Sequence, residues 1–86
     1  MGRLVMEKII EQNPDALFAD GLEGALIGYV HRGGSSPVAC YDEEKAIEVI
    51  QLNGDLTREE ALDYYYFNVA GAYVGENTPF FLVKTG

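Results

Sequence analysis

The chain has 86 residues, 48% of them hydrophobic, which fits one folded domain and excludes an intrinsically disordered tail. Its net charge is −8 and its six lysines and arginines are scattered, so the sequence lacks the basic patch that direct binding to nucleic acid or to an anionic membrane requires. A single cysteine excludes an intramolecular disulfide and fits a reducing cytoplasm, and no apolar run has the length of a membrane span.

The first half of the chain predicts one helix followed by two strands. Residues 6–12 predict a short helix that ends before Pro14, because the residue that precedes a proline avoids the helical region. Residues 24–32 and 37–41 are rich in β-branched and aromatic side chains, which is typical of strands. The Gly-Gly-Ser-Ser turn at 33–36 joins the two strands into a predicted hairpin.

The first predicted strand is apolar on both faces. Strict alternation points Ile27 and Tyr29 to one side, and Leu26 and Val30 to the other. We therefore expect this strand to be buried on both faces, or to have its second face covered by another subunit.

The second half predicts two helices and a third strand. Asp42 is the predicted N-cap of the first of these helices, which ends at Asn53-Gly54 in a left-handed conformation. Thr57 and Glu60 have the spacing of a capping box, in which each side chain satisfies an exposed backbone amide of the other residue. This box predicts the start of the second helix, and residues 79–84 predict the last strand.

The predicted order of elements is α-β-β-α-α-β. It indicates an α+β fold in which helices pack on a small three-stranded antiparallel or mixed sheet. No repeat or low-complexity segment interrupts residues 1–86, which predict a single domain. One interpretation of residues 1–5 is a disordered extension ahead of the domain.

Four aromatic residues occupy successive positions of the helix that runs from residue 57 to about residue 70. At about 100° per residue they point in four directions, so one flat core cannot bury all four rings. Tyr65 shares the predicted core stripe with Ala61, Leu62 and Val69, whereas Phe67 lies nearly opposite. Either the helix is sandwiched between the sheet and the preceding helix, or its outer rings form a homodimer or partner interface. The candidate interface residues are Tyr64, Tyr66, Phe67 and Tyr73.

A glycine-rich turn follows this helix at residues 71–79. Paired glycines permit close backbone approach, and such turns are places where ligands bind. The candidate ligand-binding residues are Gly71, Gly75, Glu76, Asn77 and Thr78. The turn lacks the lysine of a phosphate-binding loop, and Glu76 would repel a phosphate. The preferred interpretation is therefore a tight helix-to-strand connection.

Catalytic and metal-binding groupings are weak in this sequence. A hairpin with a four-residue turn would place Tyr29 opposite Cys40 and make His31 its diagonal neighbour, about 7–8 Å away along the backbone. That separation argues against a catalytic thiol–imidazole dyad, and one His with one Cys excludes an ordinary zinc site. We expect no catalytic residues, no metal and no cofactor.

Seven acidic residues lie on the two predicted helices of the second half. Their spacing is not that of a calcium loop, and they fit solvated helix faces. A sharper interpretation is mimicry of a nucleic-acid backbone. The residues are Asp42, Glu43, Glu44, Glu48, Glu59, Glu60 and Asp63.

Most of the chain resembles a family of small proteins found widely in bacteriophage and prophage genomes. The resemblance spans roughly residues 24–82, and its most specific segment, F-N-V-x-G-A-Y-V-G-E-x-T-P, covers residues 67–79. Further matches are Tyr41-Asp42, Lys45, Ile47, Glu48 and Glu59-Glu60-Ala61. The family has no established activity, so the resemblance implies a phage origin and the host cytoplasm and transfers no catalytic residues.

We therefore expect a non-enzymatic phage or prophage accessory protein that acts by protein–protein contact. A homodimer and contact with a host protein, including a defence protein, are the expected interactions, with no membrane and no direct nucleic-acid partner. The alternative is a small-ligand or nucleotide-signal binder that uses the glycine turn at a subunit junction. A nucleic-acid mimic is the least favoured interpretation.

Overall fold

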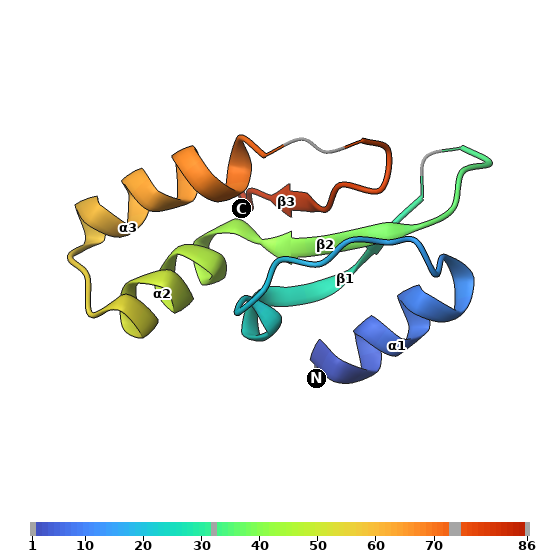
Figure 1. Cartoon of the computed structure of the whole chain (residues 1–86), viewed down its shortest axis with the longest axis horizontal. Helices are drawn as coiled ribbons and strands as arrows, with labels where there is room; N and C mark the ends of the chain where they lie inside the picture. Colours follow the sequence, from blue (N-terminus) through green and yellow to red (C-terminus); the bar gives the residue numbers. More distant parts are fainter. Residues whose placement is uncertain (1, 32, 73–74, 86) are drawn as a thin grey trace.

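The computed structural model describes residues 2–31, 33–72 and 75–85, and these form an α+β fold with a three-stranded mixed sheet (Figure 1). β1 and β2 are antiparallel, whereas β2 and β3 are parallel. The element order α-β-β-α-α-β confirms the predicted fold class. The elements are α1 (Gly2–Gln12), a 3₁₀ turn (Glu23–Ala25), β1 (Leu26–Val30), β2 (Val38–Asp42), α2 (Glu43–Gly54), α3 (Arg58–Tyr65), a π-helical turn (Tyr66–Ala70) and β3 (Phe80–Leu82).

α1 begins earlier than predicted, at Gly2. The interpretation of residues 1–5 as a disordered extension is therefore wrong for residues 2–5, which are helical. Val5 and Ile9 are four residues apart on one helix face; Ile9 is fully buried in the core, and the partly buried Val5 packs against it. This packing explains why the helix includes its first turn.

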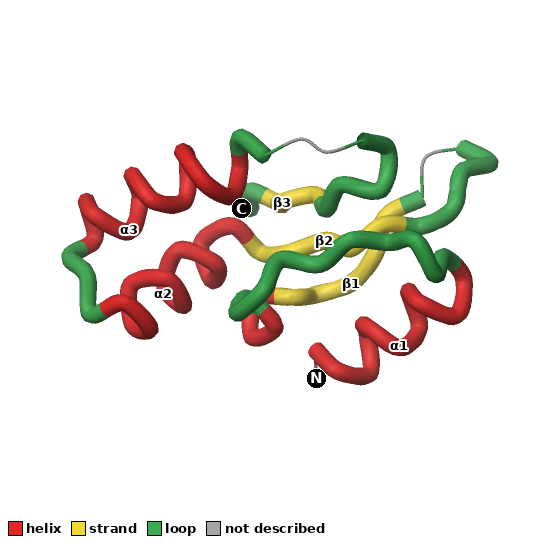
Figure 2. The backbone as a smooth tube through the Cα atoms, viewed as in Figure 1, coloured by secondary structure: helices red, strands yellow, loops and turns green. Residues whose placement is uncertain are grey.

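The core lies on one face of the sheet. Ala39 and Tyr41 of β2 are fully buried there, and the Tyr41 ring stacks on Phe81 of β3 at 5.3 Å between centroids. The segment between α1 and β1 crosses this face (Figure 2), and the Ala19 amide donates to the Tyr41 hydroxyl at 2.8 Å. Tyr65 of α3 completes this core through an edge-on contact with Phe81, at 5.5 Å between ring centroids.

The predicted hairpin register is wrong by one residue. Tyr29 pairs with Ala39, and Cys40 pairs with Gly28. The paired residues end at Val30 and Val38, so the connecting loop runs from 31 to 37 instead of from 33 to 36, and the longer loop shifts the register.

A bulge near Ile27 also breaks the predicted alternation of β1. The pairs Leu26–Tyr41 and Gly28–Cys40 leave one extra residue on β1. Because residues paired across a ladder share a face, Leu26 and Tyr29 both lie on the core side, and the prediction that they point to opposite faces is wrong.

The opposite face of the sheet is apolar but separate from the core. Paired positions place Val30 beside Val38, and Cys40 beside Phe80. Val38 and Cys40 are buried, whereas Phe80 and Leu82 are 40% and 46% exposed, and none of them belongs to the core cluster of the described residues. We call Val30, Val38, Cys40, Phe80 and Leu82 the outer sheet face.

α2 begins as the sequence predicts and ends one residue later. The Asp42 carboxylate accepts from the Lys45 amide at 3.2 Å, which confirms the N-cap. The left-handed residue is Asp55, at φ 52°, and not Gly54, which remains helical. A Cβ at Gly54 would lie 3.0 Å from Leu56 Cγ, so the glycine permits the close packing of Leu56 under the helix end.

α3 begins with the predicted capping box. The Thr57 amide donates to Glu60 Oε1 at 2.9 Å, and the Glu60 amide donates to Thr57 Oγ1 at 3.2 Å. The helix continues to Ala70, but its last turn is π-helical rather than α-helical as predicted. Asn68 Nδ2 donates to the Tyr64 carbonyl at 3.2 Å, and a side chain bonded to that carbonyl is one known cause of a widened turn.

Candidate functional site

Three aromatic rings are exposed where α3 passes into the π-helical turn. Phe67 is 84% exposed, Tyr66 56% and Tyr64 50%, whereas Tyr65 between them is fully buried. This arrangement confirms the predicted direction of Tyr65 and Phe67. We call Tyr64, Tyr66 and Phe67 the outer aromatic cluster. Tyr73, the fourth predicted interface residue, lies outside the described residues.

Tyr65 fixes the direction of this cluster because it anchors the helix to the rest of the domain. Its hydroxyl donates to Glu43 Oε2 at 2.9 Å, and its ring meets Phe81 of β3 edge-on. Burial, together with the bond to the Glu43 carboxylate, raises the pKa of Tyr65 well above its usual range. The neutral hydroxyl therefore remains a donor at physiological pH, and the rotation of α3 is determined.

The outer aromatic cluster lies beside negative charge. Glu59, Glu60 and Asp63 are exposed on α3, and Asp63 precedes Phe67 by one helical turn. Arg58 is engaged elsewhere, since Arg58 Nη2 donates to Glu44 Oε1 at 2.9 Å in a two-bond pair with that carboxylate. The surface around the cluster therefore combines aromatic rings with an acidic margin.

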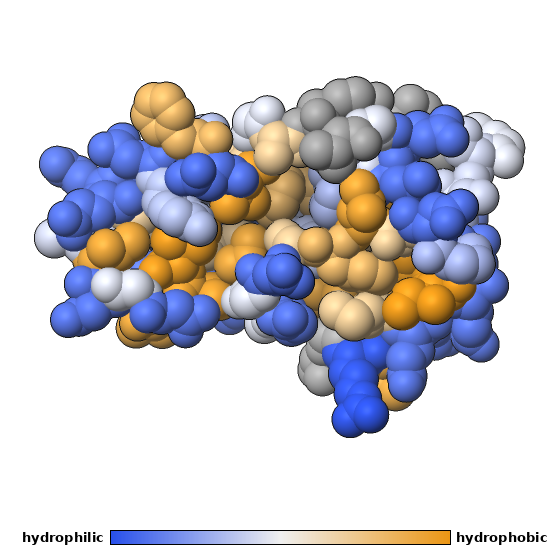
Figure 3. Space-filling view, viewed as in Figure 1, coloured by the Kyte–Doolittle hydropathy of each residue, from blue (hydrophilic) through white to orange (hydrophobic). Residues whose placement is uncertain are grey.

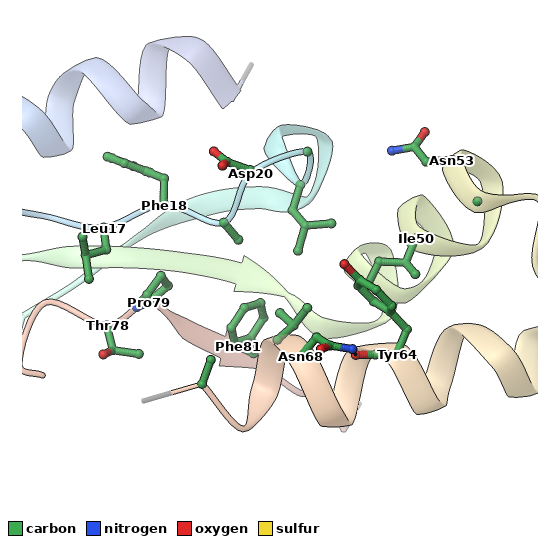
Figure 4. Close-up of a pocket in the computed structure, with 16 residues that line it drawn as sticks. Leu17, Phe18, Asp20, Ile50, Asn53, Tyr64, Asn68, Thr78, Pro79 and Phe81 are labelled. Atoms are coloured by element: carbon green, nitrogen blue, oxygen red, sulfur yellow. Dashed lines mark hydrogen bonds between the residues drawn. The ribbon is translucent and has the colours of Figure 1, made fainter. Parts of the chain in front are cut away.

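A cavity of about 620 Å³ opens beside the outer aromatic cluster. It lies between the 17–22 segment, the end of α2, the π-helical turn and the start of β3. Apolar residues gather over the middle of this side of the molecule, between polar surfaces at its two ends (Figure 3). Tyr64 and Asn53 project from the two helices toward the space that they share with Ile50 (Figure 4).

The five candidate ligand residues of the glycine turn do not form one site. Thr78 lines the 620 Å³ cavity and, with Gly75 and Glu76, a cavity of about 430 Å³; Glu76 and Asn77 line a third, polar cavity of about 320 Å³. Gly71 lines none of the three. No lysine or arginine among the described residues lines any of them.

Several of these residues form hydrogen bonds, either within the turn or to the segment after α1. Thr78 Oγ1 donates to the Gly75 carbonyl at 2.7 Å, and Gly75 has a φ of 114° that favours glycine. Asn77 Oδ1 accepts from Asn13 Nδ2 at 3.0 Å, and its carbonyl accepts from the Leu17 amide. These bonds tie the turn to the segment that crosses the core face.

The structure argues against the His31–Cys40 dyad. Tyr29 pairs with Ala39 on the core side of the sheet, and strict alternation directs His31 to the same side. Cys40, which pairs with Gly28, lies on the outer sheet face. The His31 ring instead meets the Tyr29 ring edge-on at 5.5 Å. Burial, reinforced by the Asp42 charge, raises the pKa of the Cys40 thiol, which makes it a poor nucleophile at neutral pH.

The acidic residues are partly engaged within the fold. Asp42 caps α2 and pairs with Lys84 at 2.9 Å, and these contacts lower the pKa of its carboxyl. Glu44 pairs with Arg58, and Glu43 accepts from Tyr65. The described residues contain no group of three or more His, Cys, Asp or Glu side chains that could hold a metal ion.

Two features of this region were missed from the sequence. Asn13 is buried, and its Nδ2 also donates to the Pro37 carbonyl at 2.9 Å, so it joins three segments that are far apart in the chain. The 17–22 segment forms one wall of the 620 Å³ cavity but has no periodic pattern. The Asn-Pro pair after α1 is the sequence signal for Asn13, and by itself it predicts only the end of a helix.

Comparison with known protein families, curated proteins and solved structures gave no match to this chain. The resemblance to small bacteriophage proteins therefore stays a prediction. In the part of the chain that the structure describes, none of the helices has the length and apolar character needed to cross a membrane.

Proposed function

We propose that this protein is a non-enzymatic contact protein that binds a partner protein through the outer aromatic cluster. The observation that supports this most strongly is the 84% exposure of Phe67, next to two further exposed rings on a helix whose rotation is determined. Exposed aromatic clusters of this kind usually mark contact surfaces.

The fold accounts for Tyr66, whose ring meets Tyr65 edge-on at 5.1 Å, and for Tyr64, which lines the cavity, but it leaves Phe67 84% exposed. Tyr65 makes the contacts to Glu43 and Phe81 that hold α3 in place. Burying a large apolar side chain is worth about 1.5–3 kcal/mol, and Phe67 does not realise that gain within the domain. A partner surface that covers Phe67 would realise it.

The acidic margin indicates the chemistry of the partner. Exposed acids on α3 would repel an acidic surface and attract a basic one, and the net charge of −8 acts in the same direction. We therefore expect a different protein with an apolar recess and a neutral or basic rim. The bacteriophage resemblance makes a host protein, including a defence protein, the expected class of partner.

Self-association remains a second candidate, and the outer sheet face favours it. Phe80 and Leu82 are partly exposed there, beside the buried Val38 and Cys40. Asp42, which pairs with Leu82 in the sheet, is neutralised by its ion pair with Lys84. A second copy that covered this face would bury the exposed apolar surface of Phe80 and Leu82, although the exposed acids Asp15 and Glu76 lie beside it.

The proposed contact is tested by capture from host lysate with three versions of the tagged protein. Phe67→Ser removes the outer ring, whereas Leu52→Ser removes a side chain of similar exposure, 80%, from α2. We expect a captured protein that Leu52→Ser retains and Phe67→Ser loses. Equal capture by all three versions, or equal loss from both variants, would contradict the proposal.

A further inference from the structure

The 620 Å³ cavity has the size of a small-molecule site and is independent of the proposed protein contact at Phe67. Its volume lies within the range of about 300–1,000 Å³ that is usual for ligand pockets. Phe67 does not line it, and Tyr64 is the residue that it shares with the outer aromatic cluster. The two surfaces can therefore be tested separately.

The cavity combines apolar walls with a few polar groups. Phe18, Leu22, Ile50, Val69 and Phe81 supply the apolar surface. Asp20, Asn53, Tyr64, Asn68 and Thr78 supply polar atoms from four different segments. Such a lining fits a ligand with an apolar ring body and a small polar end.

The charge of the lining is one-sided. Among the described lining residues, Asp20 is the sole carboxylate and none is a lysine or an arginine. A phosphate or carboxylate ligand would find no cationic partner there, so the nucleotide-signal alternative receives no support from this cavity.

The charges that act on the residue behind the cavity wall are also negative. Ala19 lines the cavity, and its amide donates to the Tyr41 hydroxyl. Burial is the main cause that raises the pKa of Tyr41, and the charges of Glu23 and Asp20 add to it. Tyr41 is bonded to Ala19 but does not itself line the cavity, so these charges indicate a negative potential behind the wall at Ala19 and Asp20, where a cation is favoured over an anion.

We infer that this cavity binds a small amphipathic amine, with the apolar ring between Phe81 and Ile50 and the ammonium group at the open rim, on the side of the exposed Asp20 carboxylate. The apolar walls supply most of the affinity, and the carboxylate selects the charge of the ligand. The site therefore prefers a cation to a neutral molecule of the same shape, and a neutral molecule to an anion.

Three indole compounds of matched shape test this order: tryptamine, tryptophol and indole-3-propionate, which are cationic, neutral and anionic at pH 7. Binding is followed by amide chemical shifts of Gly21, Gly54 and Ala72, which line the cavity. We expect saturable shifts with tryptamine, weaker ones with tryptophol and the weakest with indole-3-propionate. Absence of saturation with tryptamine and tryptophol, or equal binding of the anion, would overturn the inference.

Two variants assign the preference to this cavity. Asp20→Asn should lower tryptamine affinity by about twofold to fivefold and leave tryptophol unchanged, since a partly exposed ion pair is weak. Asn53→Lys adds a cation at an exposed rim position near the end of α2, where the helix dipole tolerates it, and should raise indole-3-propionate affinity.

The matched control is Asp63→Asn, which makes the same charge change on α3 outside the cavity lining. It should leave all three affinities unchanged. An equal fall in tryptamine affinity for Asp63→Asn and Asp20→Asn would show a general charge effect and overturn the assignment. Phe67→Ser should also leave tryptamine binding intact, which separates this site from the protein contact.

Discussion

Tyr65 and Phe67 lie two residues apart on one continuous helix, yet their environments are opposite. Tyr65 is fully buried, bonded to Glu43 and in contact with Phe81, whereas Phe67 is 84% exposed. Both are large aromatic residues, so residue type does not explain the difference. Helical rotation does, because two steps of about 100° carry a side chain to the other side of the helix.

This contrast teaches that one turn of a helix can present one aromatic ring to the core and another to the surface. The inner ring is explained by the fold, since every polar and apolar part of it has a partner. The outer ring has a surplus of apolar surface that the domain does not bury. The predictions below separate the two roles, from the largest expected effect to the smallest.

The largest effect is expected for Tyr65→Ala. Truncating a buried aromatic side chain costs about 3–5 kcal/mol, because transfer energy is lost and a cavity remains. Urea unfolding monitored by circular dichroism should show this loss, or an unfolded protein. A loss below about 1 kcal/mol would mean that Tyr65 does not anchor α3.

A smaller effect is expected for Thr57→Ala, which removes half of the capping box that starts α3. The cost should be about 1 kcal/mol, since the Glu60 amide loses its side-chain acceptor. The same urea experiment measures it. Glu59→Gln is the control in the same helical turn and should change the free energy of unfolding by less than half as much.

Tyr65→Phe isolates the hydroxyl of the inner ring. Losing its bond to Glu43 should cost about 1 kcal/mol at neutral pH. Because the pKa of Tyr65 is raised in the folded protein, its neutral form stabilises the fold below about pH 10, and this contribution is lost as the pH rises further. Unfolding curves from pH 8 to 11 should therefore fall more steeply for the unmodified protein than for Tyr65→Phe, and parallel curves would refute this role.

The smallest effect on stability is expected for Phe67→Ser. Surface substitutions usually change the free energy of unfolding by no more than about 0.5 kcal/mol, and Phe67 is 84% exposed. A destabilisation above about 1.5 kcal/mol would show that the ring packs within the domain after all. Partner binding should nevertheless be lost, which is the reverse of the pattern expected for Thr57→Ala.

Local features of the fold were predictable because their causes lie close together in the sequence. The Thr57–Glu60 box and the Asp42 cap involve residues three positions apart, and the opposite directions of Tyr65 and Phe67 follow from helical rotation alone. The left-handed conformation lies at Asp55 and not at Gly54, although glycine is the residue that usually adopts it. Gly54 instead remains helical where the Leu56 side chain packs close to its Cα, a steric detail that residue type alone does not reveal.

The sheet register and the cavity depend on longer-range packing. The register between β1 and β2 depends on the loop from 31 to 37 and on the bulge near Ile27. Neither feature has a distinctive residue pattern. The cavity requires the aperiodic 17–22 segment to cross the sheet, held in part by the Ala19–Tyr41 bond. These features appear only when distant segments are brought together.

The central claim, that the outer aromatic cluster contacts a partner protein, is tested most directly by photocrosslinking in host cells. Phe67→p-benzoylphenylalanine places the reactive group in the cluster, and Leu52→p-benzoylphenylalanine places it at a similarly exposed position on α2. We predict a discrete crosslinked adduct with a second protein from position 67 and none from position 52. No adduct at position 67, or the same adducts from both positions, would contradict the account.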